Sequence, residues 1–146
     1  MKTKTLCLIA FVISWQPSFP LLAQESESDT CALATKEEAE KIIGRLKEPP
    51  KSGTGILEEK ECTYTNAEGK WVKLRLYPSG RWNFKKEAVS DLKPETLPGL
   101  GEEAFAVKKG SDCEIYVRKG KIILEIDSSA GLDAAKKFAE VAAKRL

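Results

Sequence analysis

The feature that most restricts the possible folds of this chain lies in its last third. Three stretches with the residue types of β-strands, at 104–108, 113–118 and 121–127, follow one another with only short polar and glycine-containing links between them. Links this short join antiparallel neighbours, because parallel pairing needs a crossover of about a dozen residues. The sequence therefore predicts three antiparallel strands here, with turns at 109–112 and 119–120.

Two more strands are expected earlier in the chain, at 56–65 and 70–77. The turn between them, Asn66 to Gly69, contains a glycine that allows a positive φ. The second strand alternates apolar residues with charged or aromatic ones, which is typical of a strand with one face on a core.

Helical signals occur in three places. A capping box, in which Thr35 and Glu38 each accept from the other's backbone N–H, predicts a helix over 36–43. Apolar residues at helical spacing predict a short helix within 81–92 and a longer one over 131–146. The apolar stripe expected for the short helix consists of Phe84, Ala88 and Leu92.

These elements follow one another in the order α-β-β-α-β-β-β-α. We therefore expect an α+β fold, a five-stranded antiparallel sheet with the helices packed on one face. The segments 48–55 and 93–101 are rich in proline and glycine and are expected to be loops.

The N-terminus has the organisation of a secretory signal peptide, over residues 1–23. Lys2 and Lys4 precede an apolar run, and polar residues follow Ala23, after which we expect cleavage. The run is shorter than the ~20 residues that span a bilayer, so an uncleaved anchor is the less favoured alternative. The sequence predicts a periplasmic or secreted bacterial protein.

Cleavage would leave a flexible lead at 24–30 and a single α+β domain at 31–146. The whole chain has 24 Lys+Arg and 22 Asp+Glu residues, and the leader holds two of the lysines and no acid. The exported part is therefore balanced in charge and lacks the basic excess of nucleic-acid-binding proteins. We expect no nucleic-acid partner and no stable membrane anchor.

The exported part contains three cysteines, Cys31, Cys62 and Cys113. An oxidising compartment favours one disulfide, which leaves one thiol over, and the residues alone leave all three pairings open. A bridge between the first two would stabilise the fold by roughly 3–4 kcal/mol in the chain-entropy model. We expect the thiol left over to be buried rather than available for pairing between molecules.

The chain contains no histidine, which excludes Ser-His-Asp and Cys-His catalysis and removes the commonest zinc ligand. Acid clusters at 58–61 and 102–103 could provide the two carboxylates of a glycoside hydrolase. They are surrounded by lysines in the sequence, however, and exposed, solvated acids are the more common explanation of such a pattern. Gly99 and Gly101 lack the strand before and the helix after that a nucleotide-binding loop requires. We expect no catalytic residue, no metal and no cofactor.

The strongest candidate for ligand binding is a row of aromatic and cationic side chains. It occupies the face of strand 70–77 opposite the apolar one and continues past the next turn. Stacking combined with charge suits a sugar, an anionic polysaccharide or a partner protein. The alternative is a structural row that the helix at 81–92 covers. The row consists of Trp71, Lys73, Arg75, Tyr77, Arg81 and Trp82.

Three segments together carry a family resemblance. Cys31 precedes a short helix that ends at Gly44, Cys62 opens a Cys-x-Tyr strand, and 97–105 reads Leu-Pro-Gly-Leu-Gly-Glu-Glu-Ala-Phe. The chain thus resembles a family of small exported bacterial domains of unknown function, many of them actinobacterial lipoproteins. The resemblance implies a Cys31–Cys62 bridge, a cystatin-like or PsbP-like sheet with helices, and no catalytic residue. This chain lacks the lipid-bearing cysteine of the lipoprotein members.

The function expected from the sequence is that of an exported, non-catalytic binding or accessory domain. An inhibitor or interaction module acting through a loop at 49–55 or 97–101 is the alternative, and a small carboxylate-based hydrolase comes third. An envelope protein or a polysaccharide is the expected partner.

Overall fold

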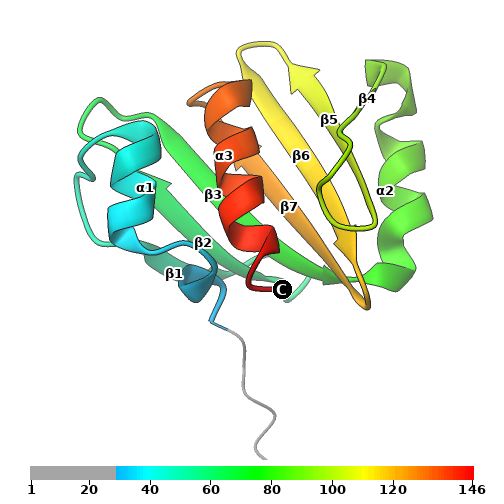
Figure 1. Cartoon of the computed structure of the whole chain (residues 1–146), viewed down its shortest axis with the longest axis horizontal. Helices are drawn as coiled ribbons and strands as arrows, with labels where there is room; N and C mark the ends of the chain where they lie inside the picture. The colour runs from blue at the N-terminus through cyan, green and yellow to red at the C-terminus, as the bar shows by residue number, and fades with distance from the viewer. Residues whose placement is uncertain (1–28) are drawn as a thin grey trace, which may run out of the picture.

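The structure is a computed structural model that describes residues 29–146. The expected signal peptide and most of the expected lead lie outside these residues. Seven strands form one sheet in the order β1-β2-β3-β7-β6-β5-β4, and every neighbouring pair is antiparallel (Figure 1). None of the helices within residues 29–146 has the length and apolar character needed to cross a membrane.

The strands are β1 (Lys51–Thr54), β2 (Lys60–Thr65), β3 (Trp71–Pro78), β4 (Glu95–Thr96), β5 (Glu103–Lys109), β6 (Asp112–Lys119) and β7 (Ile122–Ser128). The helices are α1 (Lys36–Ile43), α2 (Trp82–Ala88) and α3 (Leu132–Ala143). Short 3₁₀ turns cover Thr30–Leu33, Ser79–Arg81 and Ser90–Leu92.

The prediction of five strands is wrong, because both edge strands lie in segments expected to be loops. All four residues of β1 are exposed, and the strand pairs with β2 from Lys51 opposite Thr63 to Thr54 opposite Lys60. β4 has two exposed residues that pair with β5. A strand with no buried face shows no hydrophobic alternation, so only hydrogen bonding to a neighbour reveals it.

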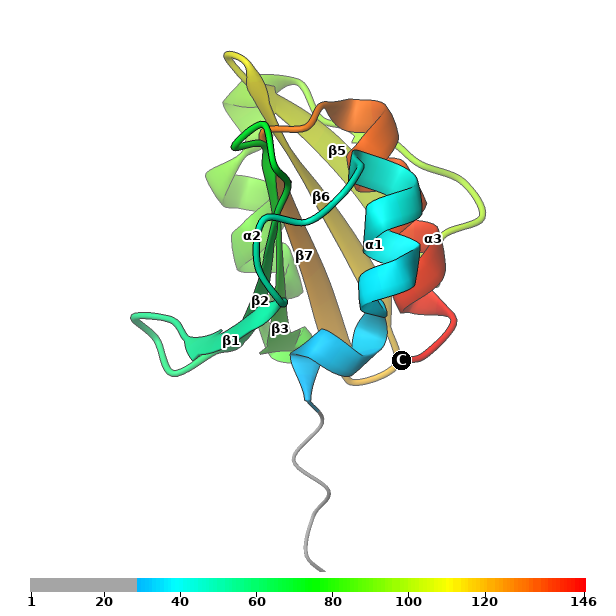
Figure 2. The same ribbon diagram turned by 90° about the vertical axis from the view of Figure 1, so that its left-hand side faces the viewer.

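The prediction that the helices share one face of the sheet is also wrong. Figure 2 shows α1 and α3 on one side of the sheet and α2 on the other. β5, β6 and β7 are therefore buried on both faces along much of their length. The larger core lies under α1 and α3, and a smaller one lies under α2. The smaller core consists of Tyr77, Trp82, Val89, Phe105, Val107, Tyr116 and Ile123.

α2 turns a different side toward the sheet than the one its apolar spacing predicts. Phe84 is 68% exposed and Leu92 is also exposed, whereas Trp82 and Val89 are buried. The indole of Trp82 packs on Phe105 with ring centroids 5.2 Å apart. Trp82 and Val89 bury their side chains in the smaller core instead, so tertiary packing and not the spacing of apolar residues decides the rotation of so short a helix.

The capping box that opens α1 is confirmed. The Thr35 hydroxyl accepts from the Glu38 N–H at 3.2 Å, and the Glu38 carboxylate accepts from the Thr35 N–H at 2.8 Å. The helix ends at Gly44, whose φ of +84° lies in a region that L side chains rarely adopt. Local sequence is therefore sufficient to define both ends of this helix.

The N-terminal turn is fastened to β2 by a disulfide between Cys31 and Cys62, with Cα atoms 5.0 Å apart. The adjoining Thr30 is buried, so the last residue of the segment expected to be a flexible lead is packed in the domain. The Tyr64 hydroxyl on β2 donates to the Ala34 carbonyl at 2.8 Å. Cys113 is an unpaired, buried thiol, and burial raises its pKa.

Candidate functional site

The aromatic and cationic row of β3 lies on the same sheet face as α2. Register places Arg75 between Glu61 on β2 and Glu125 on β7, and places Lys73 beside Asp127. The row therefore meets acidic side chains from both neighbouring strands rather than open solvent alone.

Arg75 is the centre of this polar cluster. Its Nη1 lies 2.6 Å from Glu125 Oε1, its Nε lies 3.3 Å from Glu61 Oε2, and Asp127 Oδ2 lies 3.8 Å from Nη1. Glu125 is only 3% exposed, and the ammonium of Lys85 on α2 contacts its second oxygen at 2.5 Å. Arg75 from β3 and Lys85 from α2 thus both contact one buried carboxylate and compensate its charge.

The aromatic members of the row are largely covered. Lys85 Nζ lies 3.9 Å from the centroid of the Tyr77 ring, and Tyr77 is buried. Trp82, the first residue of α2, is buried, and its Nε1 donates to Glu103 Oε2 at 2.8 Å. Trp71, Lys73 and Arg81 keep partial exposure. The six residues are therefore divided between the interior and the surface.

Asp127 is the acid in this cluster with the fewest partners. No described residue donates a hydrogen bond to its carboxylate, and Arg75 is its closest cation. Burial raises its pKa, and the neighbouring Glu114 raises it further. Glu114 itself accepts from the Tyr116 hydroxyl at 2.5 Å and pairs with Lys109 at 2.6 Å. Across residues 29–146 no cluster of three or more Cys, Asp or Glu side chains is arranged to hold a metal ion.

A second site lies at the tip of the β1–β2 hairpin, which projects away from the body of the domain (Figure 2). Ile56 is fully exposed at 100%, and Leu57 is 62% exposed. The sequence places both residues in a strand, so this site was missed. The signal for it was an apolar pair between Gly55 and a charged run, a pattern that fits a turn as well as a strand.

The hairpin tip is closed by its own hydrogen bonds. The Gly55 N–H donates to the Glu59 carbonyl at 2.7 Å, and the Glu58 N–H donates to the Gly55 carbonyl at 3.1 Å. The Glu59 carboxylate accepts from the Leu57 N–H at 2.8 Å and from the Tyr77 hydroxyl at 3.4 Å. Burial alone would raise the pKa of Glu59, but backbone N–H donors bring it below its usual value. The turn is therefore preorganised and tied to β3.

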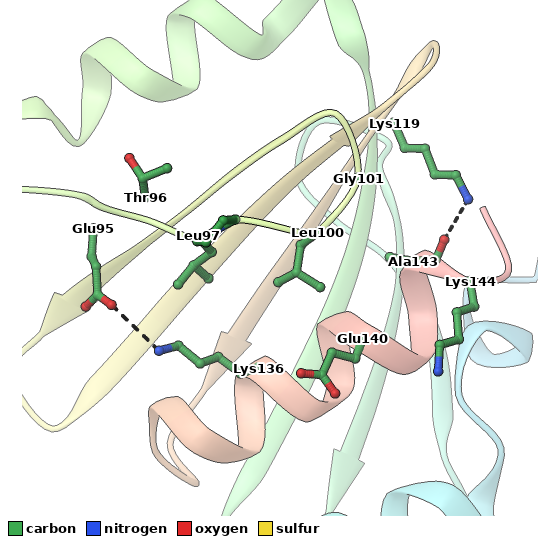
Figure 3. Close-up of a pocket in the computed structure, with 12 residues that line it drawn as sticks. Glu95, Thr96, Leu97, Leu100, Gly101, Lys119, Lys136, Glu140, Ala143 and Lys144 are labelled. Atoms are coloured by element: carbon green, nitrogen blue, oxygen red, sulfur yellow. Dashed lines mark hydrogen bonds and ion pairs between the residues drawn. The ribbon is translucent and has the colours of Figure 1, made fainter.

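A third site is a pocket of about 650 Å³ at the opposite edge of the sheet, between the segment 95–101 and α3 (Figure 3). The sequence offers 97–101 as a loop for protein contacts, whereas the structure makes it one wall of this pocket. Leu97 and Leu100 point from the loop toward α3, and lysine and glutamate side chains surround them.

No protein-family model and no curated protein matches the chain. A solved structure described as a GTP binding regulator from Thermotoga maritima superposes with a TM-score of 0.46 and 13% identity, covering 75% of this chain and 88% of that one. A likeness of this degree assigns neither a family nor a function. The resemblance to small exported bacterial domains stays a prediction.

Proposed function

We propose that this protein is an exported, non-catalytic binding domain that attaches to a partner protein through the tip of its β1–β2 hairpin. The observation that carries this proposal is the exposure of Ile56 and Leu57 on a turn that is already hydrogen-bonded. Because the turn is ordered before binding, little conformational entropy is lost when it docks.

The tip has the composition of a small contact surface. Full burial of an isoleucine or leucine side chain lowers the free energy by about 1.5–3 kcal/mol. Because Ile56 and Leu57 are exposed in the isolated domain, this free energy is available for binding a partner. Glu58 in the turn and Thr54 at the end of β1 are exposed and would form the polar rim that surrounds an apolar contact. An apolar pocket on a partner protein is the occupant that this shape and chemistry fit.

Export is supported by the disulfide and by the signal-peptide organisation of residues 1–23. Disulfides persist in oxidising compartments such as the periplasm and the extracellular medium. Glu61, Glu102 and Glu103, which belong to the acid clusters of the hydrolase alternative, each pair with a cation, and this favours a binding role, since ion pairing opposes the protonated state that a general acid needs. A secreted inhibitor is the special case in which the partner's pocket is an active site.

Site-specific photo-crosslinking in the producing cells tests the proposal. A benzophenone amino acid replaces Ile56 in one variant and Phe84 in the other, because Phe84 is 68% exposed and belongs to α2 rather than to the hairpin. We expect one defined protein adduct from position 56 and none of the same mass from position 84. Equal adducts from both positions, or none from position 56, would contradict the proposal.

A matched pair of serine substitutions extends the test. The double variant Ile56→Ser, Leu57→Ser should lose the adduct partner in co-purification, whereas Phe84→Ser should keep it. Uptake by phosphatidylcholine vesicles that depends on Ile56, without any protein adduct, would replace the partner protein by a membrane and overturn the proposal.

A further inference from the structure

The pocket between the segment 95–101 and α3 lies at the β4 edge of the sheet, while the hairpin tip lies at the β1 edge. The two sites are therefore separate, and the pocket needs its own explanation. Its volume of about 650 Å³ falls within the range of small-molecule sites.

The walls of the pocket are held in place from the sheet side. The Leu97 N–H donates to the Ala104 carbonyl, and the Glu102 N–H donates to the Arg118 carbonyl, each at 2.9 Å. At Gly101 an added Cβ would lie 2.5 Å from the Arg118 carbonyl oxygen, so only glycine allows this close approach. The loop is thus clamped at both ends and shaped before any ligand arrives.

The lining is apolar in the middle and charged at both ends. Leu97 and Leu100 form the apolar surface that faces α3 (Figure 3). At one end, Lys136 pairs with Glu95 at 3.7 Å. At the other end Lys119 and Lys144 lie around the last turn of α3.

The two lysines at the α3 end keep donors to spare. Lys119 Nζ donates to the Ala143 carbonyl at 2.8 Å, which uses one of its three N–H groups. The ammonium group of Lys144 makes no ion pair or hydrogen bond with a described residue. Glu102, the acid nearest this end along the loop, has both oxygens engaged, by Arg118 at 2.9 Å and by the Gly120 N–H at 2.9 Å.

Glu140 limits the negative charge of the ligand that can bind at the α3 end of the pocket. It lines the same pocket one helical turn before Lys144 and has no cation within ion-pair distance among the described residues. Two ammonium groups and one free carboxylate leave a single net positive charge, which balances a monoanion. A dianion such as a phosphate monoester would meet repulsion from Glu140.

From this arrangement we propose that the pocket binds a small organic monocarboxylate with an apolar body. The carboxylate lies at the α3 end of the pocket, which Lys119 and Lys144 line, and the apolar body lies against Leu97 and Leu100. The Glu95–Lys136 pair closes the far end and limits the length of the ligand.

Titration of the purified ¹⁵N-labelled protein with hexanoate tests the proposal by NMR. We expect saturable shifts of the Gly99, Gly101 and Lys144 amides, and weaker effects from acetate, which lacks the body, and from hexanol, which lacks the charge. Hexyl phosphate, at a pH where it is a dianion, should bind more weakly than hexanoate. Hexanol or hexyl phosphate binding as tightly as hexanoate would overturn the assignment.

Substitutions on α3 separate binding from folding. Lys144→Gln should weaken hexanoate binding roughly twofold to fivefold, in line with an exposed charge pair. Lys137→Gln, an exposed lysine on the same helix outside the pocket, should leave binding unchanged. Glu140→Gln should tighten hexanoate binding and reduce the discrimination against hexyl phosphate, a gain that damage to the fold would not produce. Equal affinities for the Lys144 and Lys137 variants, or no saturable shift in the pocket, would refute the site.

Discussion

Arg75 on β3 and Glu125 on β7 are directly paired on adjacent strands, with Nη1 and Oε1 2.6 Å apart. Glu125 is nearly inaccessible to solvent, so its charge depends on Arg75 and on Lys85 from α2. The pair therefore links the central strands of the sheet to the helix that covers them.

Loss of the guanidinium should destabilise the domain. Arg75→Gln leaves Glu125 with one cation in a buried position, and we expect a loss of about 2–3 kcal/mol in the free energy of unfolding, below the value for a fully buried pair because Arg75 is partly exposed. Urea denaturation measures it. Arg81→Gln, in the same row but without a described ion pair, is the control and should change the free energy by less than about 0.5 kcal/mol. Equal stability of the two variants would show that the Arg75 network contributes nothing.

Removal of the disulfide should have a larger effect. The bridge has a sequence separation of 31, and the double variant Cys31→Ser, Cys62→Ser should lower the free energy of unfolding by roughly 3–4 kcal/mol. Thermal unfolding with and without reductant measures this on the wild type, and the double variant should not respond to the reductant. A reductant effect that persists in the double variant would contradict the assigned pairing.

Cys113 should be chemically silent in the folded protein. It is buried, and burial raises its pKa, so little thiolate is present at neutral pH. With an aromatic disulfide reagent and the exported part of the chain, residues 24–146, we expect no reaction under native conditions and one reactive thiol per molecule in guanidinium chloride. Rapid native labelling would mean that Cys113 is accessible and open to an intermolecular role.

The Glu38–Arg145 pair should make stability depend on acid pH. The hydrogen bond from Arg145 lowers the pKa of Glu38 from 4.5 to about 2. A carboxylate with a lowered folded-state pKa contributes stability above its unfolded pKa and loses it as pH falls toward the folded value. Wild type should therefore exceed Glu38→Gln in thermal midpoint at pH 6, and the difference should shrink between pH 4.5 and pH 2. A difference that is constant over this window would contradict the electrostatic origin.

Preorganisation of the hairpin tip can be tested without removing its apolar side chains. In Gly55→Ala the new Cβ would overlap the Glu59 carboxylate, which would have to leave the Leu57 N–H and the Tyr77 hydroxyl. We expect the yield of the position-56 adduct to fall severalfold while the urea midpoint of the domain stays nearly unchanged. Gly80→Ala, in open space, is the control, and an identical yield from both variants would show that the turn need not be ordered.

Local signals in the sequence identified several elements correctly. The capping box of α1, the short turns after β5 and β6, and the apolar stripe of α3 each depend on residues close together in the chain. The edge strands β1 and β4 carry no such signal, since their residues are exposed and their partners lie elsewhere in the sequence. The rotation of α2 was mispredicted because Trp82 finds its place only against β5.

The candidate sites also combine features that the sequence predicts with features that depend on tertiary contacts. The residues of the β3 row could be named from alternation, but their acidic neighbours come from β2, β6 and β7, which only the register brings together. Ile56 and Leu57 became a candidate only once the turn and the projecting hairpin were known. The pocket requires α3 to pack beside the segment 95–101, more than thirty residues away.

By itself the sequence determined the antiparallel links of the last three strands, the capping of α1 and the absence of histidine chemistry, and its first residues predict an export signal. Tertiary structure decided which cysteines pair, which face of the sheet each helix covers, and which side chains remain exposed at the hairpin tip. The physical reason is range: caps, turns and periodicity act over a few residues, whereas burial, pairing and exposure depend on segments that meet only in the folded chain.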